Sequence, residues 1–202
     1  MLYWREPHYL FINIKITLIS IVTPIFGPFG WPNLEDVQLR LPSKSGTYLM
    51  TVEHKDGYLP WGVGITRRPM RERFMEHTRS FKAGDYNILD IKSAYDGIRK
   101  VVWKGWGWTD EKRADYSSRK NEIVSLALEQ LSCTRIFVID ISEPPRILER
   151  IESALVTTFH QSGNELVDKG MLLMPRKDNE EPIAISFEST SLIYGLPANL
   201  IV

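Results

Sequence analysis

Five polar side chains have the types that hydrolysis of a phosphodiester bond requires, and they lie in two separate segments of the chain. They are Tyr48, Arg73, His77, Glu152 and Asn164. This reaction needs a water nucleophile, a group to take its proton, positive charge on the non-bridging oxygens and help for the leaving oxygen. The set therefore predicts a site at which a divalent metal ion assists phosphodiester cleavage.

Each of these side chains suits one part of that chemistry. Glu152 can hold one divalent ion, Mg²⁺ or Mn²⁺, because Mg²⁺ keeps most of its waters and needs few protein carboxylates. Arg73 is permanently charged, and its guanidinium can form two hydrogen bonds to the oxygens of one phosphate. Beside a cation, Tyr48 can orient the water or act as its general base, and His77 can share the proton transfer. Asn164 would position Glu152 or a phosphate by hydrogen bonding.

Taken singly, each residue also has a structural interpretation, such as a strand aromatic, a surface charge or a turn amide. The prediction rests on their combined type, order and spacing. Glu149 competes with Glu152 as the metal ligand, because both lie on the same predicted helix. We favour Glu152 because it borders the apolar stripe of Ile151 and Leu155, which should face the sheet.

Two short strands and a helix should carry the first three of these side chains. Residues 46–52 (GTYLMTV) and 58–65 (YLPWGVGI) have the pattern of strands, and the turn EHKDG between them predicts a hairpin. A helix should follow, with Pro69 in its first turn, Thr66 as its cap and Gly84 at its end.

The rest of the predicted core has the order helix, strand, helix. Its elements are a helix over 118–131, a strand over 134–141 and a helix over about 146–160. Residues 183–188 (IAISFE) have the composition of a further strand. The order of the core elements predicts an α/β (α+β) fold with a small, three-stranded, mixed or antiparallel central sheet flanked by helices.

These residues resemble the GIY-YIG nuclease domain. The family's first triplet is GTY here, at residues 46–48, and its second is GVG, at 62–64. The family's arginine lies in the helix just after the second strand, as Arg73 does. The resemblance implies an N-terminal extension over 1–43, a nuclease-like domain over 44–166 with an insertion at about 86–117, and a C-terminal extension over 167–202.

The restriction-endonuclease-like branch of this family shares two further features with the chain. It has a histidine one turn past the arginine, as His77 follows Arg73, and an asparagine a dozen residues past the metal-binding glutamate, as Asn164 follows Glu152. The resemblance implies an endonuclease that uses Mg²⁺ or Mn²⁺ on Glu152 and cuts DNA by direct attack of an activated water. Whether RNA is cut, and whether two copies pair as a homodimer, stays open.

The second triplet departs from the family pattern. The family has a tyrosine where this chain has Gly62, flanked by Trp61. In the family that tyrosine helps to organise the hydrogen bonds of the nucleophile, and here Tyr58 could reach the site instead. The departure supports an alternative hypothesis, a GIY-YIG-like module that binds nucleic acid but is catalytically impaired.

The lysines, arginines and tryptophans between residues 67 and 120 suggest a surface that binds nucleic acid. This segment has 14 lysines and arginines against 8 aspartates and glutamates. The candidates for nucleic-acid binding are Arg67, Arg68, Arg71, Lys104 and Trp106. A solvated helical surface would also explain the charges, and a packed aromatic lid would also explain the cluster of Trp103, Trp106 and Trp108.

The composition is that of a soluble globular protein of one or two domains. The 202 residues carry no formal net charge, which excludes a chain that coats nucleic acid as a polycation. The single cysteine, Cys133, excludes an intrachain disulfide framework and a Cys-based zinc cluster. A reducing cytoplasm is therefore the compartment that we expect.

The apolar segment 9–22 (YLFINIKITLISIV) has three interpretations. Its alternation of apolar and polar residues favours a half-buried strand. A membrane span or signal segment fits less well, because Asn13 and Lys15 interrupt the apolar run. A poorly ordered leader is the third interpretation. The residues that follow, 23–45, are rich in proline and glycine and should form a linker.

Overall fold

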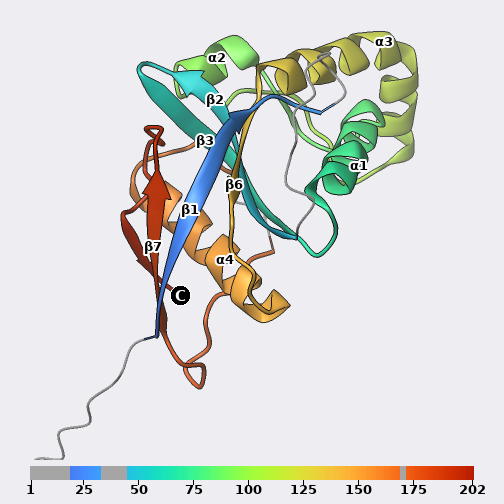
Figure 1. The fold of residues 1–202 in the computed structure, drawn as a ribbon. Coiled ribbons are helices and arrows are strands. Elements are labelled where there is room, and N and C mark those ends of the chain that lie inside the picture. The colour runs from blue at the N-terminus through green and yellow to red at the C-terminus, as the bar shows by residue number, and fades with distance from the viewer. Residues whose placement is uncertain (1–18, 33–44, 169–171) are drawn as a thin grey trace, which may run out of the picture.

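The computed structural model describes residues 19–32, 45–168 and 172–202. In these ranges the chain forms a mixed six-stranded sheet with helices on both faces (Figure 1). The strands follow the order β3-β2-β6-β1-β7-β8 across the sheet. Their bounds are β1 Ile19–Phe29, β2 Gly46–His54, β3 Gly57–Thr66, β6 Arg135–Ile139, β7 Ile183–Ser189 and β8 Asn199–Ile201. A small second sheet pairs β4 Ile88–Leu89 with β5 Val101–Trp103.

The four helices of the described residues are α1 Met70–Lys82, α2 Ile91–Tyr95, α3 Asp110–Cys133 and α4 Pro145–Gln161. The predicted hairpin is confirmed, since β2 and β3 pair antiparallel over their whole length. α4 also matches its predicted range closely. α3 begins well before the predicted residue 118, because Thr109 accepts a hydrogen bond from the backbone N–H of Lys112 and caps the helix at that point.

The general α/β class is confirmed, but the expected number of strands was wrong. The predicted three-stranded sheet corresponds to β2, β3 and β6, and three further strands extend it. β1 lies between β6 and β7, antiparallel to the first and parallel to the second. The partners of Ile25 are Ile139 and Ser189. Pairings over such distances leave no local pattern in the sequence, which is why they were missed.

Residues 23–29 form part of β1 rather than the predicted linker. The buried Thr23 hydroxyl donates to the carbonyl of Asp140 at 2.8 Å, and the N–H of Asp140 donates to the carbonyl of Pro24 at 3.1 Å. Pro28 lies where the register between β1 and β6 shifts, so its missing N–H interrupts no regular ladder. The prolines thus mark an irregular strand and do not end it.

The predicted strand within residues 9–22 lies outside the described residues up to residue 18. Residues 19–22 begin β1 and pair in parallel with residues 183–186 of β7. Among the helices of the described ranges, none has the length and apolar character needed to cross a membrane.

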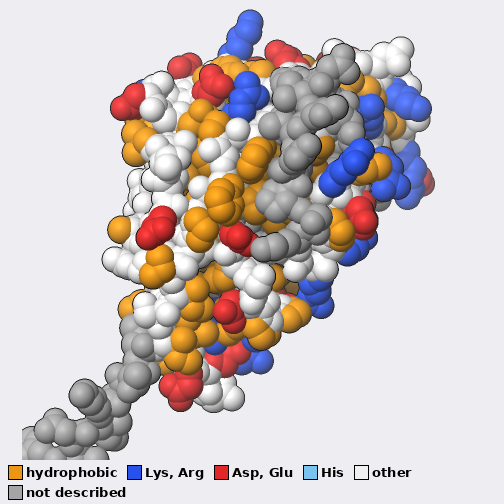
Figure 2. Space-filling model, in the orientation of Figure 1, with side chains coloured by type: hydrophobic (Ala, Val, Ile, Leu, Met, Phe, Trp, Pro, Cys, Tyr) orange, Lys and Arg blue, Asp and Glu red, His pale blue; other side chains and the backbone are white. Residues whose placement is uncertain are grey.

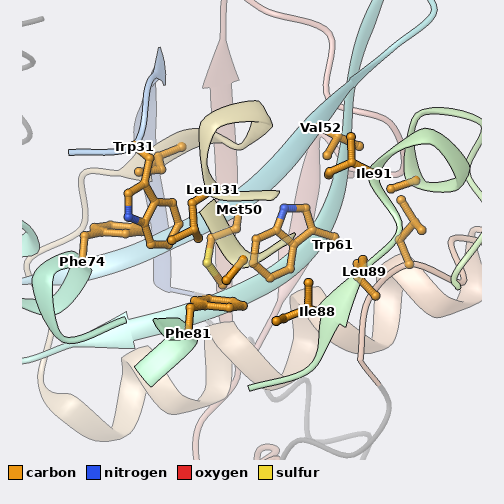
Figure 3. Packing of buried hydrophobic residues seen from close by; sticks show 14 of the residues in the cluster. Trp31, Met50, Val52, Trp61, Phe74, Phe81, Ile88, Leu89, Ile91 and Leu131 are labelled. Carbon is orange, nitrogen blue, oxygen red and sulfur yellow. The ribbon is translucent and has the colours of Figure 1, made fainter. Parts of the chain in front are cut away.

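Two apolar clusters cover the two faces of the sheet. α1 and α3 pack on the first, together with Tyr48 and Met50, whereas α4 packs on the second, together with Leu49. This division follows from the alternation of side chains along β2. In the first cluster Trp31 packs edge-on against Phe74 of α1, with ring centroids 4.9 Å apart (Figure 3).

The start of α1 differs from the prediction. The helix begins at Met70, directly after Pro69, and no side chain caps it. The Thr66 hydroxyl instead accepts a hydrogen bond from the backbone N–H of Arg68 at 3.1 Å and closes a turn before the helix. Gly84 follows the helix with a φ of +76°, as expected for a residue that ends a helix.

Candidate active site

A cleft of about 800 Å³ lies against β3, an edge strand of the sheet. Four of the five predicted site residues line it. Tyr48 comes from β2, Arg73 and His77 come from α1, and Glu152 comes from α4. Two segments that are distant in the sequence therefore meet at one cleft.

Tyr48 is the centre of a short hydrogen-bonded chain. Its phenol oxygen lies 2.7 Å from Nε2 of His77 and accepts a longer hydrogen bond, of 3.4 Å, from Nε of Arg73. Arg73 and His77 are one turn apart on α1, so both side chains project from the same side of the helix. In either tautomer of His77, this geometry fixes the position of the phenol oxygen.

His77 is held in an aromatic environment. The side chain is 6% exposed, and the rings of Trp31, Phe74 and Tyr86 lie around it at centroid distances of 5.6 to 6.4 Å. Burial, with a smaller contribution from the charge of Arg73, lowers the pKa of His77 to about 3. His77 is therefore neutral at physiological pH, and it can exchange a proton with Tyr48 only when the charge in the cleft changes.

Burial shifts the pKa of Tyr48 in the opposite direction to that of His77. It raises the pKa of Tyr48 to about 12, although the neighbouring Arg73 favours the phenolate. The free cleft thus contains a neutral phenol, whose oxygen can accept a hydrogen bond from water.

Gly64 makes room for the Tyr48 ring. The two residues are directly paired across β2 and β3, and a Cβ atom on Gly64 would lie 2.4 Å from both Cζ and the phenol oxygen of Tyr48. The ring therefore lies flat over the Gly64 backbone, and a residue with a side chain would displace it. The second glycine of the GVG triplet is needed to place the tyrosine of the GTY triplet.

Gly62 has a different neighbour. It pairs with Met50, and a Cβ atom at this position would lie 2.6 Å from the terminal methyl of that side chain. Met50 thus fills part of the space into which a tyrosine at position 62 would extend. Tyr58 does not line the cleft; its ring packs against Phe137 at 5.0 Å and belongs to the opposite face.

Glu152 reaches the cleft from the far side of the sheet. α4 packs on the second face through Ile151 and Leu155, and Glu152 lies at the border of that apolar stripe, as expected. Because β3 is the edge strand and its residues 62–65 line the cleft, the carboxylate extends past this edge. Burial, which outweighs the attraction of Arg73, raises the pKa of Glu152 to about 7.

The rival carboxylate, Glu149, has other partners. It forms ion pairs with Arg67 at 3.0 Å and with Arg146 at 3.5 Å, and it does not line the cleft. The two glutamates of α4 therefore face different surroundings, and only Glu152 lies beside Arg73 and Tyr48.

The donor set of the cleft fits a weakly held Mg²⁺ ion. No group of three or more His, Cys, Asp or Glu side chains that could enclose a metal ion occurs in the described ranges. A single carboxylate still suffices for an ion that retains its waters and is shared with a substrate phosphate. Because burial raises the pKa of Glu152, a proton competes with the ion for this carboxylate, in keeping with weak binding.

Asn164 is not brought to the cleft. Its amide nitrogen donates to the carbonyl of Pro60 at 2.7 Å, and its amide oxygen accepts from the N–H of Leu166 at 3.0 Å. Neither partner is Glu152. Pro60 lies beside the irregularity in the pairing of β2 and β3, so Asn164 secures the backbone from which Trp61 enters the cleft.

The predicted basic residues have different environments. Arg67 pairs with Glu149, and Arg68 makes a two-pronged ion pair with Glu76 of α1. Arg71 and Lys104 are exposed and form no ion pair with any described residue. Lysine and arginine side chains gather along the edge of the molecule at which α1 and α3 lie (Figure 2).

The three clustered tryptophans divide between the two interpretations. Trp103 and Trp108 pack in the first cluster, and their indole N–H groups donate to Gly84 and Asp85. Trp106 is 66% exposed and lines the cleft. The aromatic-lid interpretation therefore holds for two of the three, and of the three only Trp106 lines the cleft.

Three hydrogen-bonded polar side chains form another part of the cleft wall. They were not among the residues predicted from the sequence. Asp168 accepts hydrogen bonds from Nδ2 of Asn87 at 3.1 Å and from the guanidinium of Arg99 at 2.8 Å, and all three residues line the cleft. They come from loops without periodic patterns. An Asn, an Arg and an Asp in such loops carry no signal until the fold brings them together.

Comparisons of the chain with models of known protein families, with curated proteins and with solved structures found no match. The functional interpretation therefore rests on the residues that line the cleft.

Proposed function

We propose that the protein is a metal-dependent endonuclease of the GIY-YIG type that hydrolyses phosphodiester bonds in DNA. The observation that carries the proposal is the convergence of Tyr48, Arg73, His77 and Glu152 on one cleft. A tyrosine, an arginine, a histidine and a carboxylate at one place supply the parts that this hydrolysis needs.

Arg73 and Glu152 bind the reacting groups. The guanidinium of Arg73 holds the non-bridging oxygens of the scissile phosphate. Glu152, ionised, holds the divalent ion. When bound, that ion polarises the phosphate and neutralises the charge that develops on it. Arg73 and Glu152 line the same cleft, so both groups can act on a single phosphate.

Tyr48 and His77 handle the attacking water. The phenol oxygen of Tyr48 orients the water by hydrogen bonding while the phenol proton faces Nε2 of His77. The water oxygen forms a new bond to phosphorus as the bond to the leaving oxygen breaks, in one step and without a covalent intermediate, and the leaving oxygen takes up a proton from solvent. The water proton passes to Tyr48, whose own proton passes to His77. Burial is the larger cause that disfavours a protonated His77, and a phosphate beside Arg73 offsets the smaller one, the charge of Arg73.

A nicking assay tests the proposal. Purified full-length protein is incubated with supercoiled plasmid and with branched DNA in Mg²⁺ or Mn²⁺, with and without a chelator. We expect cleavage that the chelator abolishes and that Glu152→Ala reduces by at least about 100-fold, the size expected for the loss of an essential charge-stabilising group.

Glu149→Ala is the matched control, since it removes the same side chain one turn away on α4, outside the cleft. It should cleave at close to the wild-type rate. Intact DNA under all conditions, or equal rates for the wild type and Glu152→Ala, would falsify the enzymatic proposal.

A nucleic-acid-binding module without turnover is the second candidate. It is favoured by the space around Gly62, where Met50 occupies part of the volume of the family's second tyrosine. This candidate predicts that the protein retains DNA in the presence of a chelator, with no cleavage when Mg²⁺ or Mn²⁺ is added.

A further inference from the structure

Much of the cleft wall is apolar, and the proposed chemistry does not use it. Met50, Trp61, Phe81, Leu89 and Trp106 line the cleft beside the four polar residues. Figure 3 shows the first four of these side chains close together on one face of the sheet. A phosphate and a hydrated metal ion gain little from such a wall, whereas an apolar group on the same ligand would be stabilised by contact with it.

The size of the cleft also indicates a ligand with an organic group. Its volume of about 800 Å³ is in the range of sites that enclose a small organic group. A paired duplex is far too wide to enter and could only lie across the opening. One nucleotide with its base turned inward fits such a space.

Trp106 lies at the part of this wall that solvent reaches. Its ring contacts Tyr86 at a centroid distance of 5.3 Å, and both residues line the cleft. The loop around it is held on two sides. Nζ of Lys112 donates to the carbonyl of Trp106 at 2.8 Å, and the neighbouring N–H of Gly105 donates to Asn87 at 2.9 Å. An exposed indole on a secured loop is a suitable platform for stacking a base.

We propose that the cleft binds one unpaired nucleobase of a DNA strand, stacked on Trp106, while the adjoining phosphate binds Arg73. This inference rests on the proposed function, because it assumes that a DNA strand enters the cleft. The substrate class is then DNA with an unpaired or extruded nucleotide at the cleavage point. An intact duplex would have to lose stacking and pairing energy before it could bind in the same way.

Charge and hydrogen-bonding groups are placed to suit this ligand. The cation of Arg73 complements the phosphate, while Asn87, Arg99 and Asp168 supply the few polar groups of the wall. A small number of fixed polar groups in an apolar cleft is the usual means of orienting a ligand.

Binding in a chelator tests the inference separately from cleavage. The fluorescence anisotropy of a short labelled DNA single strand is measured with the full-length protein, and then that of the same strand in a blunt duplex. We expect tighter binding of the single strand. Trp106→Ala should weaken it by about 10-fold, as for the loss of one base–aromatic stack, and leave the duplex unaffected.

Trp106→Phe is the conservative variant and should retain most of the single-strand affinity, whereas Arg73→Ala should weaken both forms of DNA. Equal affinity for the two forms, or equal weakening of both by Trp106→Ala, overturns the base site and leaves the nuclease proposal standing. Binding of neither form in the chelator overturns the base site, and the nicking assay in Mg²⁺ then decides the nuclease proposal separately. Selective binding that depends on Trp106, without cleavage in Mg²⁺, overturns only the enzymatic proposal.

Discussion

At the scale of single residues, burial sets the proton affinities of the cleft. Removal from water disfavours charge, so it lowers the pKa of His77 and raises those of Tyr48 and Glu152. Between about pH 3 and neutral pH these three side chains are mostly uncharged, while Arg73 beside them keeps its positive charge. The free site is thus prepared to attract a phosphate.

The raised pKa of Glu152 predicts a pH-dependent cost to stability. Its pKa rises from an ordinary value of 4.5 to about 7 on folding, so the folded state loses stability as the pH rises through this window. Glu152→Gln cannot ionise and avoids the loss. We expect the variant to be more stable than the wild type at about pH 8, and the difference to be smaller at about pH 5.

Thermal unfolding of both proteins at the two pH values measures this difference. Because both proteins contain all the other titratable groups, the difference in their stability reports the ionisation of Glu152. Mg²⁺ should stabilise the wild type at the higher pH and leave Glu152→Gln unchanged, because binding to the folded state alone raises its stability. A difference between the two proteins that is independent of pH would contradict the burial of this carboxylate.

At the scale of elements, the pairing of β2 with β3 determines where the site lies. The register places Tyr48 opposite Gly64 and Met50 opposite Gly62. α1 then presents Arg73 and His77 to the tyrosine from above the same face. The hairpin and the helix that follows it therefore form three of the four parts of the site as one local unit.

Gly62 and Gly64 of β3 should respond differently to the same substitution. Gly64→Ala brings a methyl group within 2.4 Å of the Tyr48 ring, which is packed on all sides, and should cost about 2 kcal/mol of stability. It should also displace the phenol oxygen and reduce nicking. Gly62→Ala meets only the flexible end of Met50, which can move, and should cost less than about 1 kcal/mol.

Urea unfolding together with the nicking rate distinguishes the two variants. Gly62→Ala is the matched control for the loss of glycine in a strand. If Gly64→Ala were as stable and as active as Gly62→Ala, then Tyr48 would not depend on the close approach that the structure describes.

Local elements were the predictable part of this molecule. The hairpin, α1 and α4 follow from turn residues and from apolar residues at helical spacing, and Glu152 could be preferred to Glu149 from its place beside the apolar stripe. The partners of Asn164 could not be anticipated in this way. Its hydrogen bond to Pro60 depends on how a distant loop meets an irregular strand, and no local pattern encodes that contact.

At the scale of the whole molecule, the fold depends on pairings between distant segments. β1 and β7 come from the predicted extensions and lie side by side in the same sheet as β2, β3 and β6 (Figure 1). The wall of Asn87, Arg99 and Asp168 has the same origin, since its members meet only in the folded chain. These features could not be predicted, because a single sequence does not reveal which remote segments will be neighbours.

The central claim is that α1 and α4, which are distant in the sequence, contribute to one catalytic site. The nicking rates of Arg73→Ala, Glu152→Ala and the double variant test it most directly. Residues that act as a unit lose most of their effect once the first is removed. We therefore predict that each single variant loses nearly all activity and that the double variant is hardly slower than the slower single one. Near-wild-type rates for either single variant, or losses that multiply in the double variant, would contradict the claim.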